Sequence, residues 1–196
     1  MPSSPTDKEP LPMPVNPEYR RRLMELIQRV GVRHGEVKLS KGGTSSYYID
    51  CRMVTTHPEG AFLIGEIILA MLEGDAVDAI GGPTLGADPI VGAVCYASYC
   101  HNRPLPGFIV RKATKEHGLQ KMIEGHLPPG AKAAVVEDVF TTGGSVLDAI
   151  KEVEKAGGKV VRVIGIVDRL QGARERFEAA GYRFAPIFTK ADLGLE

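Results

Sequence analysis

The spacing of apolar positions in the first third of the chain predicts two helices. Apolar residues recur three and four positions apart in two segments, 16–31 and 58–73, as on one face of an α-helix. Asn16 is suited to cap the first helix, Pro17 fits its first turn, and Gly31 is its expected end.

The segment between these helices alternates apolar and polar residues, which is typical of a β-hairpin. Val37 and Leu39 stand between polar neighbours, Gly42 and Gly43 favour a turn, and 47–51 favours a strand.

From Val77 onward the pattern changes to short apolar runs separated by helical segments. Four runs predict strands: "VDAIGG", "FIVRK", "AKAAVVED" and "KVVRVIGIVD". Unbroken Val/Ile runs belong to strands that are covered on both faces, as in a parallel sheet. Three segments predict helices, namely 88–99, 145–156 and 173–180. The fold class is therefore α/β: one domain over 16–196, with a central, mostly parallel sheet flanked by helices and a smaller N-terminal helix and hairpin within 16–56.

Proline content sets the beginning of the chain apart from this domain. Five prolines fall within the first fourteen residues, which predicts a disordered leader over 1–15 rather than a secretion signal. The longest apolar stretch, 61–72, is interrupted by Gly65 and Glu66, so we expect no membrane span.

Charge and cysteine content narrow the classes of function. The chain has 24 basic and 24 acidic side chains, so no overall field attracts nucleic acid, and any anion site must be local. Its three cysteines form no CxxC pair, which indicates a reducing cytoplasm. Cys95, Cys100 and His101 match no zinc spacing, and we interpret the two cysteines as structural.

The segment "VVEDVFTTGGS", Val135 to Ser145, combines a strand, two acids and a loop of small residues before a helix. Glycines there allow close backbone approach, hydroxyls donate hydrogen bonds, and a helix N-terminus offers free N–H groups, so 141–145 suits a phosphate. The lysine of a P-loop is absent, which argues against a nucleoside-triphosphatase.

The two acids, Glu137 and Asp138, would repel a phosphate unless they faced another part of the ligand. A sugar phosphate resolves the conflict, because ring hydroxyls donate to carboxylates while the phosphate occupies the loop. Two alternatives stay open on the residues alone: a helix-capping turn with solvated acids, and a metal site.

A second group of polar residues, in "FIVRKATKEHGLQKMIEG", follows a strand. Arg111, Lys112, Lys115 and His117 lie within seven residues, which suits a basic loop that closes over a charged leaving group. A solvated surface loop is the alternative.

These motifs resemble those of a known family. "VVEDVFTTGGS" looks like the phosphoribosyl-diphosphate motif of type I phosphoribosyltransferases, and RKxxKxHG is similar to the catalytic loop of orotate phosphoribosyltransferases. "LSKGGTSSYYIDCR" resembles that family's hood hairpin, "GGPTLGADPI" its diphosphate turn, and "VDRLQGA" its orotate-binding strand end. The matches run in order from Val37 to Gly172.

The resemblance implies a role for each matching residue. Arg111, Lys112, Lys115 and His117 would engage the diphosphate and carry catalysis, and Thr141 and Arg169 would contact orotate. The ribose 5-phosphate would be bound by Glu137, Asp138, Val139, Phe140, Thr141, Thr142, Gly143, Gly144 and Ser145.

It also implies the reaction and its partners. Orotate and phosphoribosyl diphosphate would give orotidine 5′-monophosphate and diphosphate, a step of pyrimidine biosynthesis, with Mg²⁺ on the diphosphate and no protein ligand assignable to it. The enzyme would be a cytoplasmic homodimer in which the loop 111–126 reaches the neighbouring site. Two alternatives are a purine phosphoribosyltransferase and a non-catalytic regulator that senses phosphoribosyl diphosphate.

The chain departs from the family pattern at a few positions. Leu85 and Gly86 stand where many members carry a Tyr-Lys pair, and Ser40 takes the place of a hood lysine. Tyr48 and Ile49 occupy positions where two aromatics are expected near the base.

Overall fold

The structure is a computed structural model that describes residues 15–38, 44–112 and 121–196. Its centre is a six-stranded sheet in the order β5-β4-β3-β6-β7-β8. The strands are β3 (Ala79–Pro83), β4 (Gly107–Val110), β5 (Ile123–Gly125), β6 (Lys132–Phe140), β7 (Lys159–Asp168) and β8 (Phe184–Thr189). All neighbouring strands are parallel except β4 and β5, which confirms the mostly parallel sheet.

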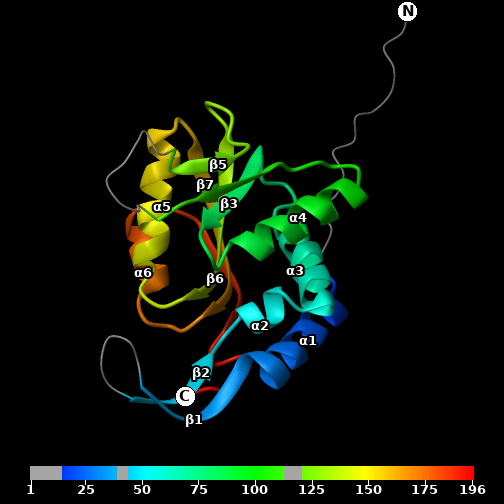
Figure 1. The fold of residues 1–196 in the computed structure, drawn as a ribbon, viewed down its shortest axis with the longest axis vertical. Helices are drawn as coiled ribbons and strands as arrows, with labels where there is room; N and C mark the ends of the chain where they lie inside the picture. The colour runs from blue at the N-terminus through cyan, green and yellow to red at the C-terminus, as the bar shows by residue number, and fades with distance from the viewer. Residues whose placement is uncertain (1–14, 39–43, 113–120) are drawn as a thin grey trace, which may run out of the picture.

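Helices cover both faces of this sheet (Figure 1). α5 (Gly144–Lys155) and α6 (Ala173–Ala179) pack on one face, and α3 (Pro58–Met71) and α4 (Asp88–Cys100) on the other. Successive side chains of a strand point to opposite faces, so Val135 joins the α5/α6 cluster while Val136 joins the α3/α4 cluster. Burial on both faces explains why these strands read as unbroken apolar runs.

A smaller N-terminal unit precedes the sheet along the chain. It consists of α1 (Pro17–Leu26), the π-helical turn η1 (Ile27–Gly31), β1 (Val32–Lys38), β2 (Thr44–Ile49) and α2 (Arg52–Thr55). Asn16 Oδ1 accepts a hydrogen bond from the Glu18 N–H at 2.9 Å, as a helix N-cap does. β1 and β2 form an antiparallel hairpin, and the predicted glycine turn at 42–43 lies outside the described residues.

The first helix also contacts the C-terminal strand of the central sheet. Arg20 Nη2 donates to the Ile187 carbonyl oxygen at 3.0 Å, and the Arg20 guanidinium lies 4.6 Å from the centre of the Phe188 ring. The N-terminal unit is thus attached to β8, a strand formed by the C-terminal part of the chain.

The predicted helices and four predicted strands are present, with ends that differ by a few residues. Three short elements were not predicted: α2, β5 and β8. The first strand of the hairpin also begins earlier than expected, at Val32, directly after the turn η1. Across 15–38, 44–112 and 121–196, the structure contains no helix with the length and hydropathy to cross a bilayer. The predicted leader, 1–15, lies outside the described residues except for Val15.

Candidate active site

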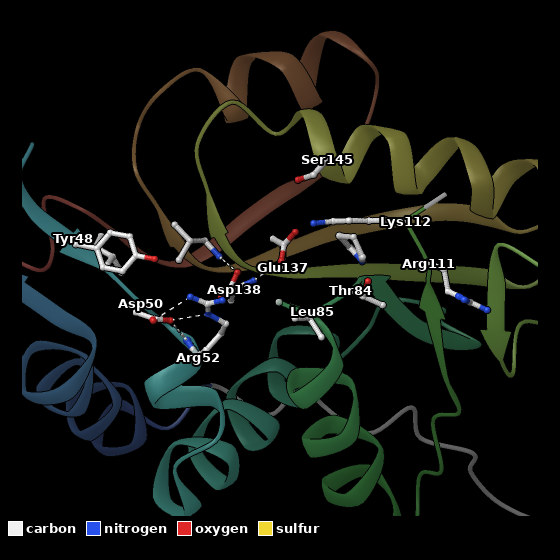
Figure 2. Close-up of a pocket in the computed structure, with 14 residues that line it drawn as sticks. Tyr48, Asp50, Arg52, Thr84, Leu85, Arg111, Lys112, Glu137, Asp138 and Ser145 are labelled. Atoms are coloured by element: carbon white, nitrogen blue, oxygen red, sulfur yellow. Dashed lines mark hydrogen bonds and ion pairs between the residues drawn. The ribbon is translucent and has the colours of Figure 1, made fainter. Parts of the chain in front are cut away.

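A cavity of about 720 Å³ opens at the carboxyl ends of β3, β4 and β6 (Figure 2). Ligands of open α/β sheets bind at this edge, beyond the carboxyl ends of the strands. The cavity is lined by Tyr48, Ile49, Asp50, Arg52, Pro83, Thr84, Leu85, Gly86, Arg111, Lys112, Glu137, Asp138, Val139 and Ser145. The N-terminal hairpin, the turn after β3, the end of β4 and the acidic motif thus meet in one place.

The two acids of the motif form one wall of the cavity. The Val139 N–H donates to Asp138 Oδ1 at 2.8 Å, which holds that carboxylate against the end of β6. The pKa of the Glu137 carboxyl is raised to about 8, first by burial and then by the neighbouring negative charge of Asp138, while Lys112 opposes the shift. Hydroxyl donors or a cation at this wall would stabilise the charged form of Glu137.

The turn after β3 packs directly against these acids. A Cβ atom at Gly86 would stand 2.0 Å from Glu137 Oε1 and 2.6 Å from Asp138 Oδ1. Only a glycine fits there while the two carboxylates keep their positions, because real contacts of a Cβ are not that short. The Leu85–Gly86 sequence therefore fits this chain's own arrangement of acids.

The small-residue loop leads from β6 into the N-terminus of α5. Gly143 has a left-handed backbone with φ of 74°, and α5 begins at Gly144. Thr141 and Thr142 are partly buried, and Ser145 lines the cavity. The free N–H groups of a helix N-terminus favour an anion at this position.

Val139 and Phe140 were predicted as part of the same binding segment, and their side chains have different surroundings. Val139 lines the cavity. The Phe140 ring is buried in the α5/α6 cluster, 5.5 Å from the Phe177 ring centre and 4.9 Å from that of Phe184. Only the main chain of Phe140 remains available for a ligand.

The basic residues stand at the end of β4. The antiparallel pairing of β4 with β5 brings both ends of the following segment together, and the Arg111 N–H donates to the Met122 carbonyl oxygen at 2.9 Å. Arg111 and Lys112 line the cavity, and Figure 2 shows Lys112 extending toward Glu137. Lys115 and His117 lie outside the described residues.

Arg169 follows β7 and lies against the hairpin rather than in the cavity lining. The Arg169 guanidinium is 5.4 Å from the centre of the Tyr47 ring, within the range of a cation–π contact. The backbone N–H of Arg169 donates to the Phe140 carbonyl oxygen at 2.9 Å. Its Nε is buried and has no hydrogen-bond partner among the described residues. Arg169 is not among the residues that line the cavity, so its predicted contact with orotate stays a prediction.

Two cavity residues, Asp50 and Arg52, were not identified as functional from the sequence. Arg52 Nε donates to Asp50 Oδ1 at 2.9 Å and Nη2 donates to Oδ2 at 3.1 Å. This bidentate pair holds the pKa of the Asp50 carboxyl below its usual range. The signal in the sequence was the Asp-x-Arg spacing at the end of the predicted hairpin.

The cavity suits a metal ion whose ligands come partly from the protein and partly from a bound substrate. In the described part of the chain, no three His, Cys, Asp or Glu side chains gather as a metal site would require. The Glu137 and Asp138 carboxylates supply hard oxygen atoms beside a phosphate cradle, and Mg²⁺ binds through few carboxylates together with phosphate oxygens. The residues present therefore fit Mg²⁺ held mainly by a diphosphate.

The class of protein follows from the fold and this cavity: an α/β sheet with an acidic pair, a phosphate cradle and an N-terminal hood defines a type I phosphoribosyltransferase. A search against protein-family models gave no match. The chain is 47% identical over 175 residues to an orotate phosphoribosyltransferase of Nostoc, covering 89% of this chain and 84% of that protein.

Solved structures agree with this relationship. The crystal structure of Mycobacterium tuberculosis orotate phosphoribosyltransferase with Fe(III) dicitrate matches with a TM-score of 0.81 and 43% identity, over 90% of this chain and 99% of that one. The same enzyme in complex with 5-phospho-α-D-ribosyl 1-diphosphate matches with a TM-score of 0.78 and 40% identity, over 90% and 99%. The chain therefore belongs to the orotate phosphoribosyltransferase family, whose members are pentosyltransferases.

Proposed function

We propose that the protein transfers the 5-phosphoribosyl group from phosphoribosyl diphosphate to orotate, and that the reaction takes place in this cavity. The products are orotidine 5′-monophosphate and diphosphate, and the step belongs to pyrimidine biosynthesis. The observation that carries the proposal is that one cavity is lined by the acid pair Glu137 and Asp138, by Ser145 at the start of α5 and by the basic residues at the end of β4. Membership of the family identifies the acceptor as orotate.

The acids and the cradle bind the phosphoribosyl group. Glu137 and Asp138 accept hydrogen bonds from the ribose hydroxyls, and the loop 141–145 surrounds the 5-phosphate. This division of roles is supported by the separation of the two acids from the helix N-terminus. Carboxylates accept hydrogen bonds from hydroxyls, and the free N–H groups of the helix N-terminus favour a phosphate.

Catalysis stabilises charge on the departing diphosphate. N1 of orotate attacks C1 of the ribose while the bond to diphosphate breaks, through a transition state with oxocarbenium character. Arg111 and Lys112 line the cavity, and Lys115 and His117 follow them in the sequence. Cations that meet charge formed only as the bond breaks lower the barrier more than they strengthen substrate binding.

Two further groups complete the site. Arg169, whose guanidinium lies beside Tyr47 of the hairpin, binds the orotate carboxylate together with Thr141. Glu137 and Asp138 are the carboxylates that would orient an Mg²⁺ ion on the diphosphate, and such an ion would supply positive charge beside the leaving group.

The working form is a homodimer in which the loop 111–126 completes the neighbouring site. Surface apolar residues support it: Tyr96 and Tyr99 on α4 are 72% and 75% exposed, and Phe62 on α3 is 47% exposed. Phe62 and Tyr96 border an apolar groove of about 470 Å³ between these helices. Exposed apolar patches of this kind mark protein interfaces.

All three cysteines are free thiols, which supports a cytoplasmic location.

An orotate assay tests the reaction directly. Purified protein with Mg²⁺ and phosphoribosyl diphosphate should consume orotate, followed by its ultraviolet absorbance, and release one diphosphate per orotidine 5′-monophosphate formed. Adenine, guanine and hypoxanthine serve as control acceptors. Turnover of a purine with none of orotate would support the purine alternative, and binding without any turnover would support the regulator.

A further inference from the structure

Three cationic side chains line the cavity within the part of the chain that the structure describes, and they come from two directions. Arg111 and Lys112 extend from the end of β4, whereas Arg52 rises from α2 on the opposite side, beside Leu85 and Asp138 (Figure 2). The first two belong to the basic motif. Arg52 has no role in the reaction as described so far.

The geometry holds the Arg52 guanidinium in one orientation. Its Nε and Nη2 bind both oxygens of Asp50, and the Arg52 N–H also donates to Asp50 Oδ1 at 3.2 Å. Asp50 is itself fixed, because its N–H donates to the Gly31 carbonyl oxygen at 2.8 Å. A guanidinium has five N–H donors and Asp50 engages two of them, so the remaining donors are available to a ligand.

The turn after β3 provides no cation of its own. Position 86 is a glycine where the family resemblance leads us to expect lysine, and a Cβ there would require the Glu137 and Asp138 carboxylates to move from their present positions. A diphosphate at this turn would therefore meet two carboxylates without a cation from the turn. Arg52 stands beside the same turn and the same acids, on a different element.

We propose that Arg52 binds the diphosphate of phosphoribosyl diphosphate and replaces the lysine that position 86 lacks. This inference rests on the proposed function, because it assigns a further residue to the same site. In the proposed function the ribose hydroxyls, on C2 and C3, lie at the acid pair. C1, which carries the diphosphate, is bonded directly to C2. A guanidinium beside Asp138 is thus within reach of the leaving group.

Orotate is the less favourable partner for Arg52. Arg169 is already assigned to orotate and lies beside Tyr47 of the hairpin, whereas Arg52 lies toward the turn after β3. A planar guanidinium can hold a phosphate group through two parallel hydrogen bonds.

Titration calorimetry with magnesium diphosphate, together with steady-state kinetics, tests the proposal. Arg52→Ala should weaken diphosphate binding about 10- to 100-fold and raise the KM for phosphoribosyl diphosphate, with the KM for orotate changed less than about twofold. Arg52→Lys keeps the charge but loses the bidentate geometry, so it should recover part of the affinity.

Arg21→Ala is the matched control. Arg21 has the same side-chain exposure as Arg52, 53%, and also pairs with carboxylates, but it lies on α1 away from the cavity. This variant should bind diphosphate as the unchanged protein does. If Arg52→Ala fails to fold, judged by circular dichroism, Arg52→Gln and Arg52→Lys are compared instead.

Each outcome has one meaning. Unchanged diphosphate affinity in the Arg52 variants, or a rise confined to the KM for orotate, would overturn the role of Arg52. Failure of the unchanged protein to use orotate would count against the proposed function alone, because diphosphate binding is measured without turnover.

Discussion

Glu137 has an environment that differs strongly from that of a solvated side chain of its type. It is largely buried beside Asp138, so its charged form loses hydration and meets a like charge. Its pKa of about 8, against the ordinary 4.5, means that near neutral pH the ligand-free protein keeps this carboxyl protonated. Ribose hydroxyls and Mg²⁺ favour the charged form, so substrate binding should release a proton.

This shift predicts a pH dependence of stability. Between about 4.5 and 8 the unfolded chain ionises Glu137 while the folded chain does not, so raising the pH stabilises the unfolded state. Glu137→Gln removes this effect. The free energy of unfolding of the original protein should fall relative to that of the variant, on the order of 2–4 kcal/mol across this range, with no further change above about 8.

Urea unfolding of the ligand-free protein at a series of pH values measures the difference. Glu175→Gln, which changes an exposed carboxyl on α6, is the control and should parallel the original protein. A constant difference between the original protein and Glu137→Gln from pH 4 to 9 would contradict the raised pKa.

At the residue scale, the sequence predicted those parts of the site that are contiguous. Glu137, Asp138 and the loop up to Ser145 lie within one motif, so their chemistry is visible in the order of residues. Arg52 was missed because its importance comes from the folding of α2 against the turn at Leu85, which is distant in sequence. The buried packing of Phe140 was missed for a related reason, since an aromatic residue beside a binding loop has two possible directions.

The N-terminus of α5 is the element to which we assign the proposed phosphate binding. Gly143 adopts φ of 74°, and a Cβ there would lie 2.8 Å from the Phe177 Cζ atom. Gly143→Ala therefore introduces both backbone strain and overpacking. We expect a loss of about 2–4 kcal/mol in stability and weaker binding of phosphoribosyl diphosphate.

Gly181→Ala separates the two contributions. Gly181 has φ of 83°, but no atom lies within 4 Å of the added Cβ, so this variant should lose only about 1–2 kcal/mol from backbone strain. Substrate affinity should be unchanged in it. Equal losses of stability in the two variants, measured by urea unfolding, would show that contact with Phe177 contributes nothing.

At the element scale, the periodic helices and the apolar strand runs were predictable, whereas α2, β5 and β8 were not. α2 has four residues and β5 has three, too few for a period to emerge. β8 contains Pro186, which weakens a strand pattern, and the structure places this strand at the edge of the sheet, where proline is tolerated. β5 matters most for function, because its pairing with β4 joins the two ends of the basic segment.

At the scale of the whole molecule, the pairing of β4 with β5 fixes both ends of the basic segment. β4 and β5 hold residues 110 and 123 side by side, so the segment between them leaves and returns at one point. If this loop completes the neighbouring site, a subunit without Lys115 and a subunit without the acid pair can together form one intact site. If it acts within its own subunit, they cannot.

Mixing two inactive variants distinguishes these arrangements. Lys115→Ala and the double variant Glu137→Gln/Asp138→Asn should each turn over orotate at least about 100-fold more slowly than the original protein. Random exchange of subunits makes half of the dimers hybrid, each with one intact site, so activity should recover to about a quarter of the original. Native mass spectrometry of the mixture confirms the exchange. Hybrid dimers without recovered activity would show that Lys115 acts in its own subunit, and a protein that stays monomeric at all assay concentrations would remove the shared site altogether.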